Sequence, residues 1–188
     1  MKSKPHLLVV SGPSGVGKGT LLRRILEESG LPLMMSVSAT TRKPRPGEVD
    51  GKNYHYLSFA EFESKRLAGE FLECFEVFNT GTWYGTLRKT VDDGLAAGYW
   101  VVLEIDVQGA KKVKEQFPKA LMFFIEPKSI DVLKKRLQGR GTESKEAMQS
   151  RLATALEELQ HAHEFEHRIV NDDLDVAVRE FIGILTGN

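Results

Sequence analysis

The sequence has a single cysteine, Cys74, and no excess of either charge, because 26 Lys and Arg residues balance 26 Asp and Glu residues. One cysteine excludes a disulfide framework and a Cys-x-x-Cys metal site within the chain, and it suits a reducing, cytoplasmic compartment. A general nucleic-acid binder carries a basic excess, so the zero net charge argues against that class. Any phosphate chemistry must therefore depend on cations that are gathered locally.

Long hydrophobic runs, internal repeats and low-complexity tracts are also missing. The apolar part of the N-terminal stretch MKSKPHLLVV is too short for a signal peptide or a membrane span, so no membrane partner is expected. The 188 residues, 41% of them hydrophobic, are enough for one compact domain with a sizeable core.

Apolar runs of strand length alternate with helical patterns along most of the chain. This alternation predicts an α/β fold with a parallel sheet that is covered by helices on both faces. The predicted strands are 7–10, 99–105, 121–125 and 168–170. The predicted helices lie near 18–28, 89–97, 108–116, 129–140, 145–166 and 174–185.

Residues 38–88 interrupt the alternation. A stretch rich in proline and glycine comes first, and Ser58 with Glu61 then forms a capping-box pattern that opens a short helix. The following segment EFLECFEVFNTGTWYGT alternates apolar and polar residues around a turn signal at Asn79–Gly81. We therefore predict a small mixed α+β insert at 38–88 and a lid at 128–150. The core comprises 1–37, 89–127 and 151–188.

The segment GPSGVGKG, residues 12–19, fits the pattern GxxxxGK between a predicted strand and a predicted helix. Such glycines let backbone N–H groups surround an anion at the positive end of a helix, and Lys18 is placed to reach the outer phosphates. A tight strand–helix turn is the alternative interpretation, and the flanking elements favour the phosphate loop.

The residue after Lys18 is Gly19, where the general motif has a Ser or Thr that binds magnesium. Either Thr20 contacts a phosphate while Mg²⁺ is held mainly through water, or another segment supplies the metal's protein contact. Asp106 follows an apolar strand, and ligands of open α/β sheets bind at such strand ends. It is therefore the candidate for holding Mg²⁺ through water.

A second group of cations, Arg42, Lys43 and Arg45, lies in the proline-rich stretch, with Tyr54 downstream. Arginine suits bidentate phosphate binding, but most charge runs are solvated loops. From this loop alone both interpretations stay open.

Five segments together resemble the guanylate kinase family, in order and over nearly the whole chain. They are SVSATTRKPRPGEVDGKNY, FLECFEVFNTGTWYG, LEIDVQGA, KKRLQGRGTES and IVNDDLD. The sequence GKGT within the phosphate loop is similar to the loop of nucleoside monophosphate kinases. The resemblance implies a kinase that uses ATP, with Mg²⁺, to phosphorylate GMP, and it implies these site residues.

The residues implied for ATP are Gly12, Pro13, Ser14, Gly15, Val16, Gly17, Lys18, Gly19, Thr20 and Asn171. Those implied for GMP are Arg42, Arg45, Tyr54 and Tyr84 at the phosphate, Ser38, Glu73 and Thr86 at the guanine, and Glu104 nearby. The implied catalytic set is Lys18, Arg42, Arg136, Arg140 and Arg151.

The chemistry of guanine agrees with a role for Glu73. Guanine presents two adjacent donors, N1–H and N2–H₂, that a carboxylate can accept, whereas adenine has an acceptor at N1. The alternating pattern of the strand equally allows Glu73 to face outward, and the resemblance favours the role in reading the base.

Two other functions are compatible with parts of the sequence. A kinase for another monophosphate, such as AMP or dTMP, would share the phosphate loop. A non-catalytic guanylate-kinase-like binding module would share the overall pattern, although its loop would be degraded. His161, His163 and His167 are expected on the solvated face of one long helix rather than at a zinc site.

Overall fold

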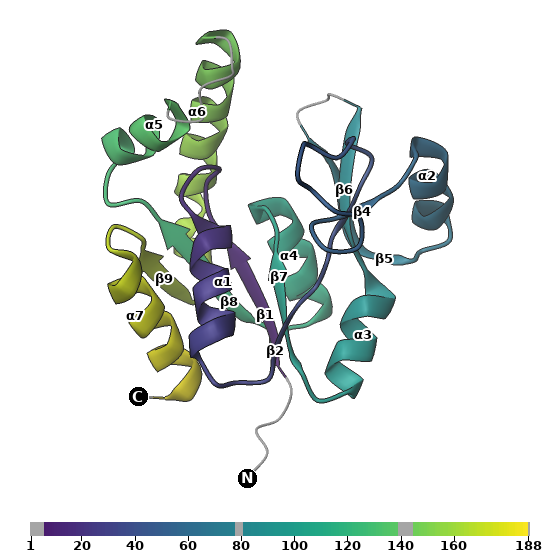
Figure 1. Ribbon diagram of the computed structural model, residues 1–188, viewed down its shortest axis with the longest axis horizontal. Helices are drawn as coiled ribbons and strands as arrows, with labels where there is room; N and C mark the ends of the chain where they lie inside the picture. Colours follow the sequence, from purple (N-terminus) through teal and green to yellow (C-terminus); the bar gives the residue numbers. More distant parts are fainter. Residues whose placement is uncertain (1–5, 78–80, 139–144, 188) are drawn as a thin grey trace. The chain divides into compact units, whose positions relative to one another are not determined.

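The computed structural model describes residues 6–77, 81–138 and 145–187 (Figure 1). The chain divides into two compact units. The loop unit comprises Leu8–Leu31, Glu104–Ala110 and Leu121–Asn188. The insert unit comprises Met1–Leu7, Pro32–Leu103 and Lys111–Ala120. The division into core, insert and lid made from the sequence stays a prediction.

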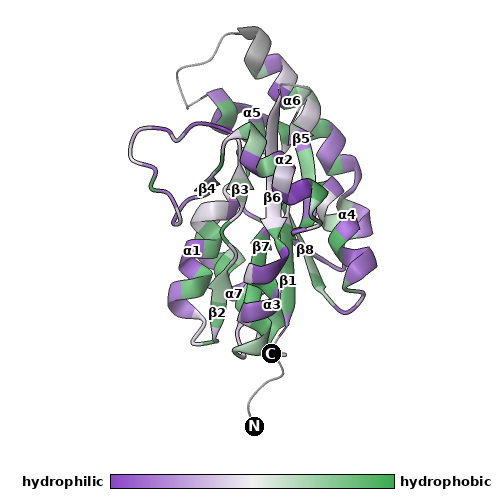
Figure 2. Ribbon diagram, turned by 90° about the vertical axis from the view of Figure 1, so that its right-hand side faces the viewer, coloured by the Kyte–Doolittle hydropathy of each residue, from purple (hydrophilic) through white to green (hydrophobic). Residues whose placement is uncertain are grey.

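A five-stranded parallel sheet has the strand order β2-β7-β1-β8-β9. Its strands are β1 (Leu7–Ser11), β2 (Leu33–Met35), β7 (Trp100–Glu104), β8 (Leu121–Glu126) and β9 (His167–Val170). Figure 2 shows β1, β7 and β8 largely in the green of hydrophobic residues, and Leu8, Val9 and Val10 are fully buried. The predicted parallel sheet is confirmed, and β2 is a strand that the sequence patterns did not indicate.

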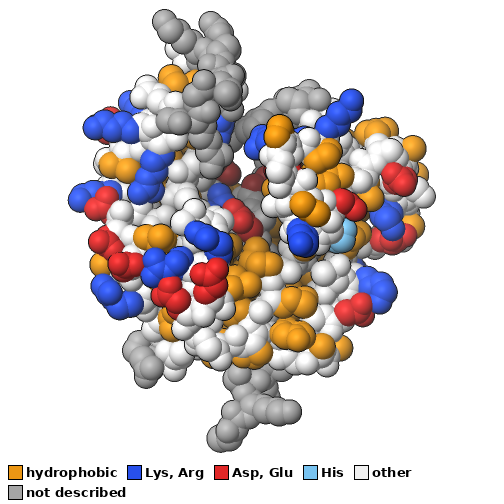
Figure 3. All heavy atoms as spheres, in the orientation of Figure 1, with side chains coloured by type: hydrophobic (Ala, Val, Ile, Leu, Met, Phe, Trp, Pro, Cys, Tyr) orange, Lys and Arg blue, Asp and Glu red, His pale blue; other side chains and the backbone are white. Residues whose placement is uncertain are grey.

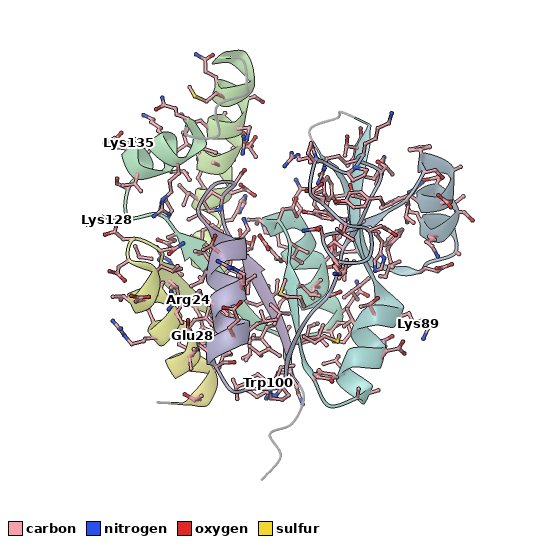
Figure 4. All side chains as sticks on the ribbon, viewed as in Figure 1. Arg24, Glu28, Lys89, Trp100, Lys128 and Lys135 are labelled. Carbon is pink, nitrogen blue, oxygen red and sulfur yellow. The ribbon has the colours of Figure 1, made fainter. Side chains whose placement is uncertain are left out.

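The loop unit contains the helices α1 (Lys18–Glu28), α5 (Ile130–Gln138), α6 (Lys145–Gln160) and α7 (Leu174–Thr186). α1 packs beside α7, where Arg24 pairs with Glu28 on its own helix and with Asp175 at 3.0 Å on the other (Figure 4). The side chain of Asp173 caps α7 by accepting from the backbone N–H of Val176 at 3.0 Å. These helices confirm four of the predicted ones.

The predicted helix 145–166 is too long, because α6 ends at Gln160. A 3₁₀ turn (Ala162–Glu164) and then β9 follow, so His163 and His167 are on different elements and no helix presents the three histidines on one face. Ala162 and Phe165 are buried, and this packing ends the helix where no glycine or proline marks a boundary.

The insert unit holds a second sheet with the order β4-β3-β6-β5. Its strands are β3 (Ala39–Thr40), β4 (His55–Tyr56), β5 (Phe71–Val77) and β6 (Thr82–Leu87). β5 and β6 are antiparallel, as predicted, while β3 and β4 are parallel. Of the turn signal between β5 and β6, Asn79 and the residue after it lie outside the described residues.

Two helices of this unit follow local signals in the sequence. α2 (Phe59–Leu67) begins at the predicted capping box, in which Ser58 and Glu61 satisfy each other's backbone N–H groups. α3 (Arg88–Ala96) follows β6 directly, at the helical pattern that predicted a helix near 89–97. Phe62 of α2 stacks on Phe71 of β5 with ring centroids 4.4 Å apart, so the helix covers the sheet with aromatic surface.

α4 (Val107–Gln116) follows β7. Within the described ranges, no helix is both long and apolar enough to cross a membrane. On the face drawn in Figure 3, basic and acidic side chains are interspersed, in keeping with the zero net charge.

Candidate active site

The loop between β1 and α1 requires glycine at defined positions. Gly12 has a φ of 140°, and a Cβ there would lie 2.3 Å from the carbonyl oxygen of Ile125. Gly17 caps the start of α1 with a φ of 99°, and a Cβ there would lie 2.7 Å from Nδ2 of Asn171. Only glycine fits both the backbone angles and the space, so the pattern of the motif has a direct steric cause.

Lys18 lies at the first turn of α1 and folds back over the loop. Its Nζ donates to the carbonyl oxygen of Gly12 at 2.5 Å and to that of Pro13 at 3.3 Å. The ammonium group is thus held by neutral oxygens at the place where the motif predicts a phosphate.

Three predicted site residues from other elements reach the same loop. Arg136 of α5 donates from Nη1 to the carbonyl oxygen of Val16 at 2.9 Å, and Asn171, which follows β9, donates to the same oxygen at 2.9 Å. Arg151 of α6 donates to the hydroxyl of Ser14 at 3.0 Å. Arg140, the predicted partner of Arg136, lies outside the described residues.

Glu158 of α6 is a loop contact that the sequence analysis missed. Its Oε2 accepts from the backbone N–H of Ser14 at 3.3 Å. Burial raises the pKa of this carboxyl group, while the nearby charge of Lys18 lowers it. A glutamate in a polar helix carries no motif, so only its position in the fold reveals the contact.

Two acidic residues, Glu104 and Asp106, lie at the carboxyl end of β7 with Ile105 between them. A Cβ at Gly19 would lie 3.6 Å from Oε2 of Glu104, so the loop unit brings Glu104 to the start of α1. Asp106 accepts from the backbone N–H of Gly109 at 2.7 Å and thereby caps α4. Thr20 is exposed on α1. Carboxylate and hydroxyl oxygens are ligands that Mg²⁺ accepts, directly or through water, so this donor set fits the metal.

In the insert unit, the structure brings Arg42, Tyr54 and Tyr84 together, and their role at the GMP phosphate stays a prediction. Nε of Arg42 donates to the hydroxyl of Tyr84 at 3.1 Å. The Arg42 guanidinium carbon lies 5.4 Å from the ring centroid of Tyr54, whose ring meets that of Tyr84 edge to face at 5.6 Å. The Arg42 guanidinium and the Tyr84 hydroxyl are groups that can donate to an anion, and the Tyr54 ring lies beside them.

The Arg45 side chain is exposed, and its backbone forms a tight turn. The N–H of Glu48 donates to the carbonyl oxygen of Arg45 at 3.0 Å across Pro46 and Gly47, and Gly47 has a φ of 85°. Proline followed by a glycine with positive φ is the signature of a type II turn. The turn returns the side chain of Glu48 to Arg42, a contact that the sequence analysis missed although the letters RPGE contain its signal.

Glu73 and Thr86 face each other across β5 and β6. The Thr86 hydroxyl donates to Oε1 of Glu73 at 2.6 Å, and the two residues are 1% and 4% exposed respectively. The outward-facing alternative for Glu73 is therefore wrong. The pairing register shifts between Phe71 and Glu73, so strict alternation fails and Phe71, Leu72 and Glu73 are all buried.

The base-reading candidates and the anion site share one strand. Tyr84 and Thr86 are two residues apart on β6, and side chains at this spacing project from the same face of a strand. Ser38 lies just before β3 and is half-buried, and its carbonyl oxygen accepts from the N–H of His55 at 2.9 Å.

Comparison with known proteins accounts for this combination of a phosphate loop and a buried carboxylate–hydroxyl pair. A family model described as guanylate kinase matches residues 4–187. The chain belongs to the guanylate kinase family. The predicted family, α/β fold and enzyme class are thereby confirmed.

Individual guanylate kinases match over most of their length. The guanylate kinase of Gloeobacter violaceus is 53% identical over 175 residues, which are 92% of this chain and 83% of that protein. The guanylate kinase of Rhodopirellula baltica is 46% identical over 181 residues, which are 96% and 87% of the two chains. The crystal structure of guanylate kinase from Anaplasma phagocytophilum matches with a TM-score of 0.80 and 32% identity, covering 100% of this chain and 87% of that one.

Proposed function

We propose that this member of the guanylate kinase family transfers the γ-phosphoryl group of ATP to GMP, giving ADP and GDP. The observation that carries the choice of acceptor is the buried pair of Glu73 and Thr86. A carboxylate accepts from guanine N1–H and N2–H₂, and a hydroxyl donates to O6. Adenine has an acceptor at N1, which would meet the carboxylate unfavourably, so the pair supports GMP over AMP.

The phosphate of GMP is bound by Arg42, Tyr54 and Tyr84, with Arg45 nearby. The support is the contact between the Arg42 guanidinium and the two tyrosines. Ser38 and Glu104 complete the acceptor site, as the family resemblance implies.

ATP is bound by residues 12–20, whose backbone N–H groups surround its phosphates. Lys18, Arg136 and Arg151 then exchange their present neutral acceptors for phosphate oxygens, which are better partners for a cation. Asn171 supports ATP binding by holding the Val16 carbonyl, and Arg140 joins the catalytic cations from the lid.

In the transfer step, an oxygen of the GMP phosphate attacks the γ-phosphorus and the bond to the β-bridging oxygen breaks, so ADP leaves. The acceptor phosphate is already largely ionised at neutral pH, because its second pKa is about 6. No general base is needed, and catalysis consists of positioning and of stabilising charge on the transferring group. Lys18, Arg136 and Arg151 stabilise that charge.

Mg²⁺ supplies further positive charge at the ATP phosphates when it is bound. Asp106 would hold it through water, with Glu104 adjacent, because Gly19 has no side chain that could bind it. The nucleotide substrates and the single cysteine are compatible with the proposed cytoplasmic location.

Measuring ADP release with GMP, AMP and dTMP as alternative acceptors tests this proposal. We expect a specificity constant for GMP that exceeds that for AMP by roughly 10⁴-fold, because a site built to hydrogen-bond its substrate rejects an analogue that leaves its polar groups unpaired. Comparable specificity constants for GMP and AMP would contradict the proposal. ADP release that no acceptor stimulates would indicate a module that binds nucleotide without transfer.

A further inference from the structure

The carboxylate of Glu48 is the centre of four hydrogen bonds in the insert unit. Its Oε1 accepts from Nη2 of Arg42 at 3.0 Å, and its Oε2 accepts from Nη1 of Arg42 at 2.9 Å. Oε2 also accepts from the Tyr56 hydroxyl at 2.8 Å and from the backbone N–H of Arg45 at 2.7 Å. Neither Glu48 nor Tyr56 is among the functional residues that the sequence analysis named.

These contacts divide the guanidinium of Arg42 into two edges. A guanidinium has five N–H groups in a rigid plane. Glu48 takes the edge formed by Nη1 and Nη2, and the other N–H of Nη1 donates to the Lys43 carbonyl oxygen at 2.8 Å. The opposite edge is formed by Nε, which donates to Tyr84, and by the second N–H of Nη2. Among the residues that the structure describes, none accepts from that second N–H.

We infer that Glu48 is a positioning residue for the acceptor phosphate. It holds Arg42 by one edge so that the other edge, together with the Tyr84 hydroxyl, is presented to the phosphate of GMP. This inference rests on the proposed role of Arg42 in binding that phosphate.

Two features distinguish this arrangement from an ordinary surface ion pair. The Arg42 and Glu48 side chains are only 18% and 19% exposed, and the type II turn of Pro46 and Gly47 holds the carboxylate in place. The hydrogen bonds from Arg42 lower the pKa of Glu48 to about 2, so the carboxylate stays ionised at any pH suitable for assay. A free arginine side chain samples many rotamers, and fixing it before the substrate arrives removes that entropic cost from binding.

The experiment compares Glu48→Gln with wild type in steady-state kinetics, and with Glu63→Gln as the matched control. Glu63 makes a similar two-bond pair with Arg66 on α2 of the same unit, at 2.6 and 2.7 Å. We expect Glu48→Gln to raise KM for GMP roughly tenfold to a hundredfold, the effect of weakening one or two charge-assisted hydrogen bonds. KM for ATP should stay within about twofold, and Glu63→Gln should change neither constant.

Guanosine, which lacks the phosphate, separates positioning from general damage to the site. Its inhibition constant should be unchanged in Glu48→Gln, because the base contacts of Glu73 are intact. Equal losses for GMP and guanosine would show that Glu48 only maintains the fold and would overturn the inference. A lower KM for GMP would overturn it in the other direction, since the carboxylate would then compete with the phosphate for Arg42.

Arg42→Lys, alone and combined with Glu48→Gln, distinguishes the inference from the proposed function beneath it. Lysine keeps the charge but lacks the planar guanidinium that Glu48 can hold by one edge. In the Arg42→Lys background, Glu48→Gln should therefore raise KM for GMP by less than about threefold. If Arg42→Lys alone leaves KM for GMP unchanged, the proposed role of Arg42 fails. If Arg42→Lys impairs GMP use while Glu48→Gln does not, the role of Arg42 stands and the inference about Glu48 is wrong.

Discussion

The two units hold the cations that we propose for phosphate binding in different ways. In the loop unit, Lys18 and Arg136 donate to backbone carbonyl oxygens and Arg151 donates to the Ser14 hydroxyl. In the insert unit, Arg42 is paired with the full charge of Glu48. A cation that donates to a neutral oxygen can exchange that acceptor for a phosphate oxygen, whereas a cation on a carboxylate keeps its geometry and has part of its charge compensated.

The difference matches what each substrate demands. ATP brings several negative charges, and charge shifts within the transferring group during the proposed step, so positive charge is most useful there. In the proposed reaction, GMP must be distinguished from other monophosphates by its base, and a fixed geometry at its phosphate would keep the guanine aligned with Glu73. We therefore expect the loss of a positive charge to matter most in the loop unit, and the loss of a fixed side-chain geometry to matter most in the insert unit.

Lys18→Ala should give the largest effect, because it removes the cation that folds over the phosphate loop of the loop unit. We expect turnover to fall at least about 100-fold, as when a charge-stabilising donor is lost from an active site. GMP affinity, measured by calorimetric titration, should stay within about twofold. A large loss of GMP affinity would show that Lys18 serves the other substrate and would remove the contrast between the units.

Glu73→Gln should give the next largest effect and tests the insert unit. Glutamine keeps the shape but replaces one acceptor oxygen by a donor NH₂, so one guanine contact becomes a donor–donor clash. We expect a loss of at least about 2 kcal/mol in kcat/KM for GMP, the cost of a lost charged hydrogen bond and an unsatisfied buried group. Use of AMP should change far less, or rise.

The exposed Glu76 on the same strand supplies the control for that substitution. Glu76→Gln should leave kcat/KM for both nucleotides within about twofold, because surface substitutions have small effects. If Glu73→Gln keeps the wild-type preference for GMP, Glu73 does not read the base.

Asn171→Ala should have a moderate effect confined to the loop unit. It removes a buried donor to the Val16 carbonyl, and we expect the free energy of unfolding to fall by about 1–2 kcal/mol with a few-fold rise in KM for ATP. Asp172→Asn, which breaks the exposed pair with Lys128, should cost less than about 1 kcal/mol. Denaturant unfolding and ATP titrations measure both, and equal effects of the two substitutions would contradict the assigned role.

The smallest expected effect concerns stability, to which Glu48 and Glu158 should contribute with opposite pH dependences. Hydrogen bonds from Arg42 lower the pKa of Glu48 from 4.5 to about 2, so its contribution to stability is present above pH 4.5 and is lost as the pH falls toward 2. Burial raises the pKa of Glu158 above 4.5, so its contribution is present below pH 4.5 and is lost as the pH rises through the raised pKa.

Thermal melting of Glu48→Gln and Glu158→Gln between pH 3 and pH 8 measures this pair. The melting temperature of Glu48→Gln should lie below that of wild type, and this difference should shrink as the pH falls. The melting temperature of Glu158→Gln should rise relative to that of wild type as the pH rises from 4.5. Parallel curves for the two variants would mean that the carboxylates have similar environments in the two units.

Sequence patterns predicted what depends on local chemistry. The capping box of Ser58, the glycines of the phosphate loop and the buried strands of the parallel sheet follow from neighbouring residues, and the structure has all three. The strand β2 has only three residues, which is too short for a periodic pattern.

The burial of Glu73 depends on a register shift in the pairing of β5 with β6. The hydrogen bond that Glu158 accepts from Ser14 depends on the packing of α6 near the phosphate loop. Such contacts join residues far apart in the chain, so no local pattern contains them. The family resemblance supplied the proposed role of Glu73, and Glu158 emerged only from the folded geometry. The contact of Glu48 with Arg42 had a local signal in the turn Arg45–Glu48, which the sequence analysis did not use.

The spacing of Tyr84 and Thr86 on β6 has a consequence for the size of the substrate. A strand rises about 3.3 Å per residue, so covalent geometry holds the two positions about 7 Å apart, and no loop movement alters that separation. If Tyr84 binds the phosphate and Thr86 the guanine, as we propose, the strand fixes the distance between the two positions that bind them. A guanosine 3′-monophosphate carries the same chemical groups at a different separation, so under the proposed assignment we expect β6 to favour the 5′-monophosphate over the 3′-monophosphate.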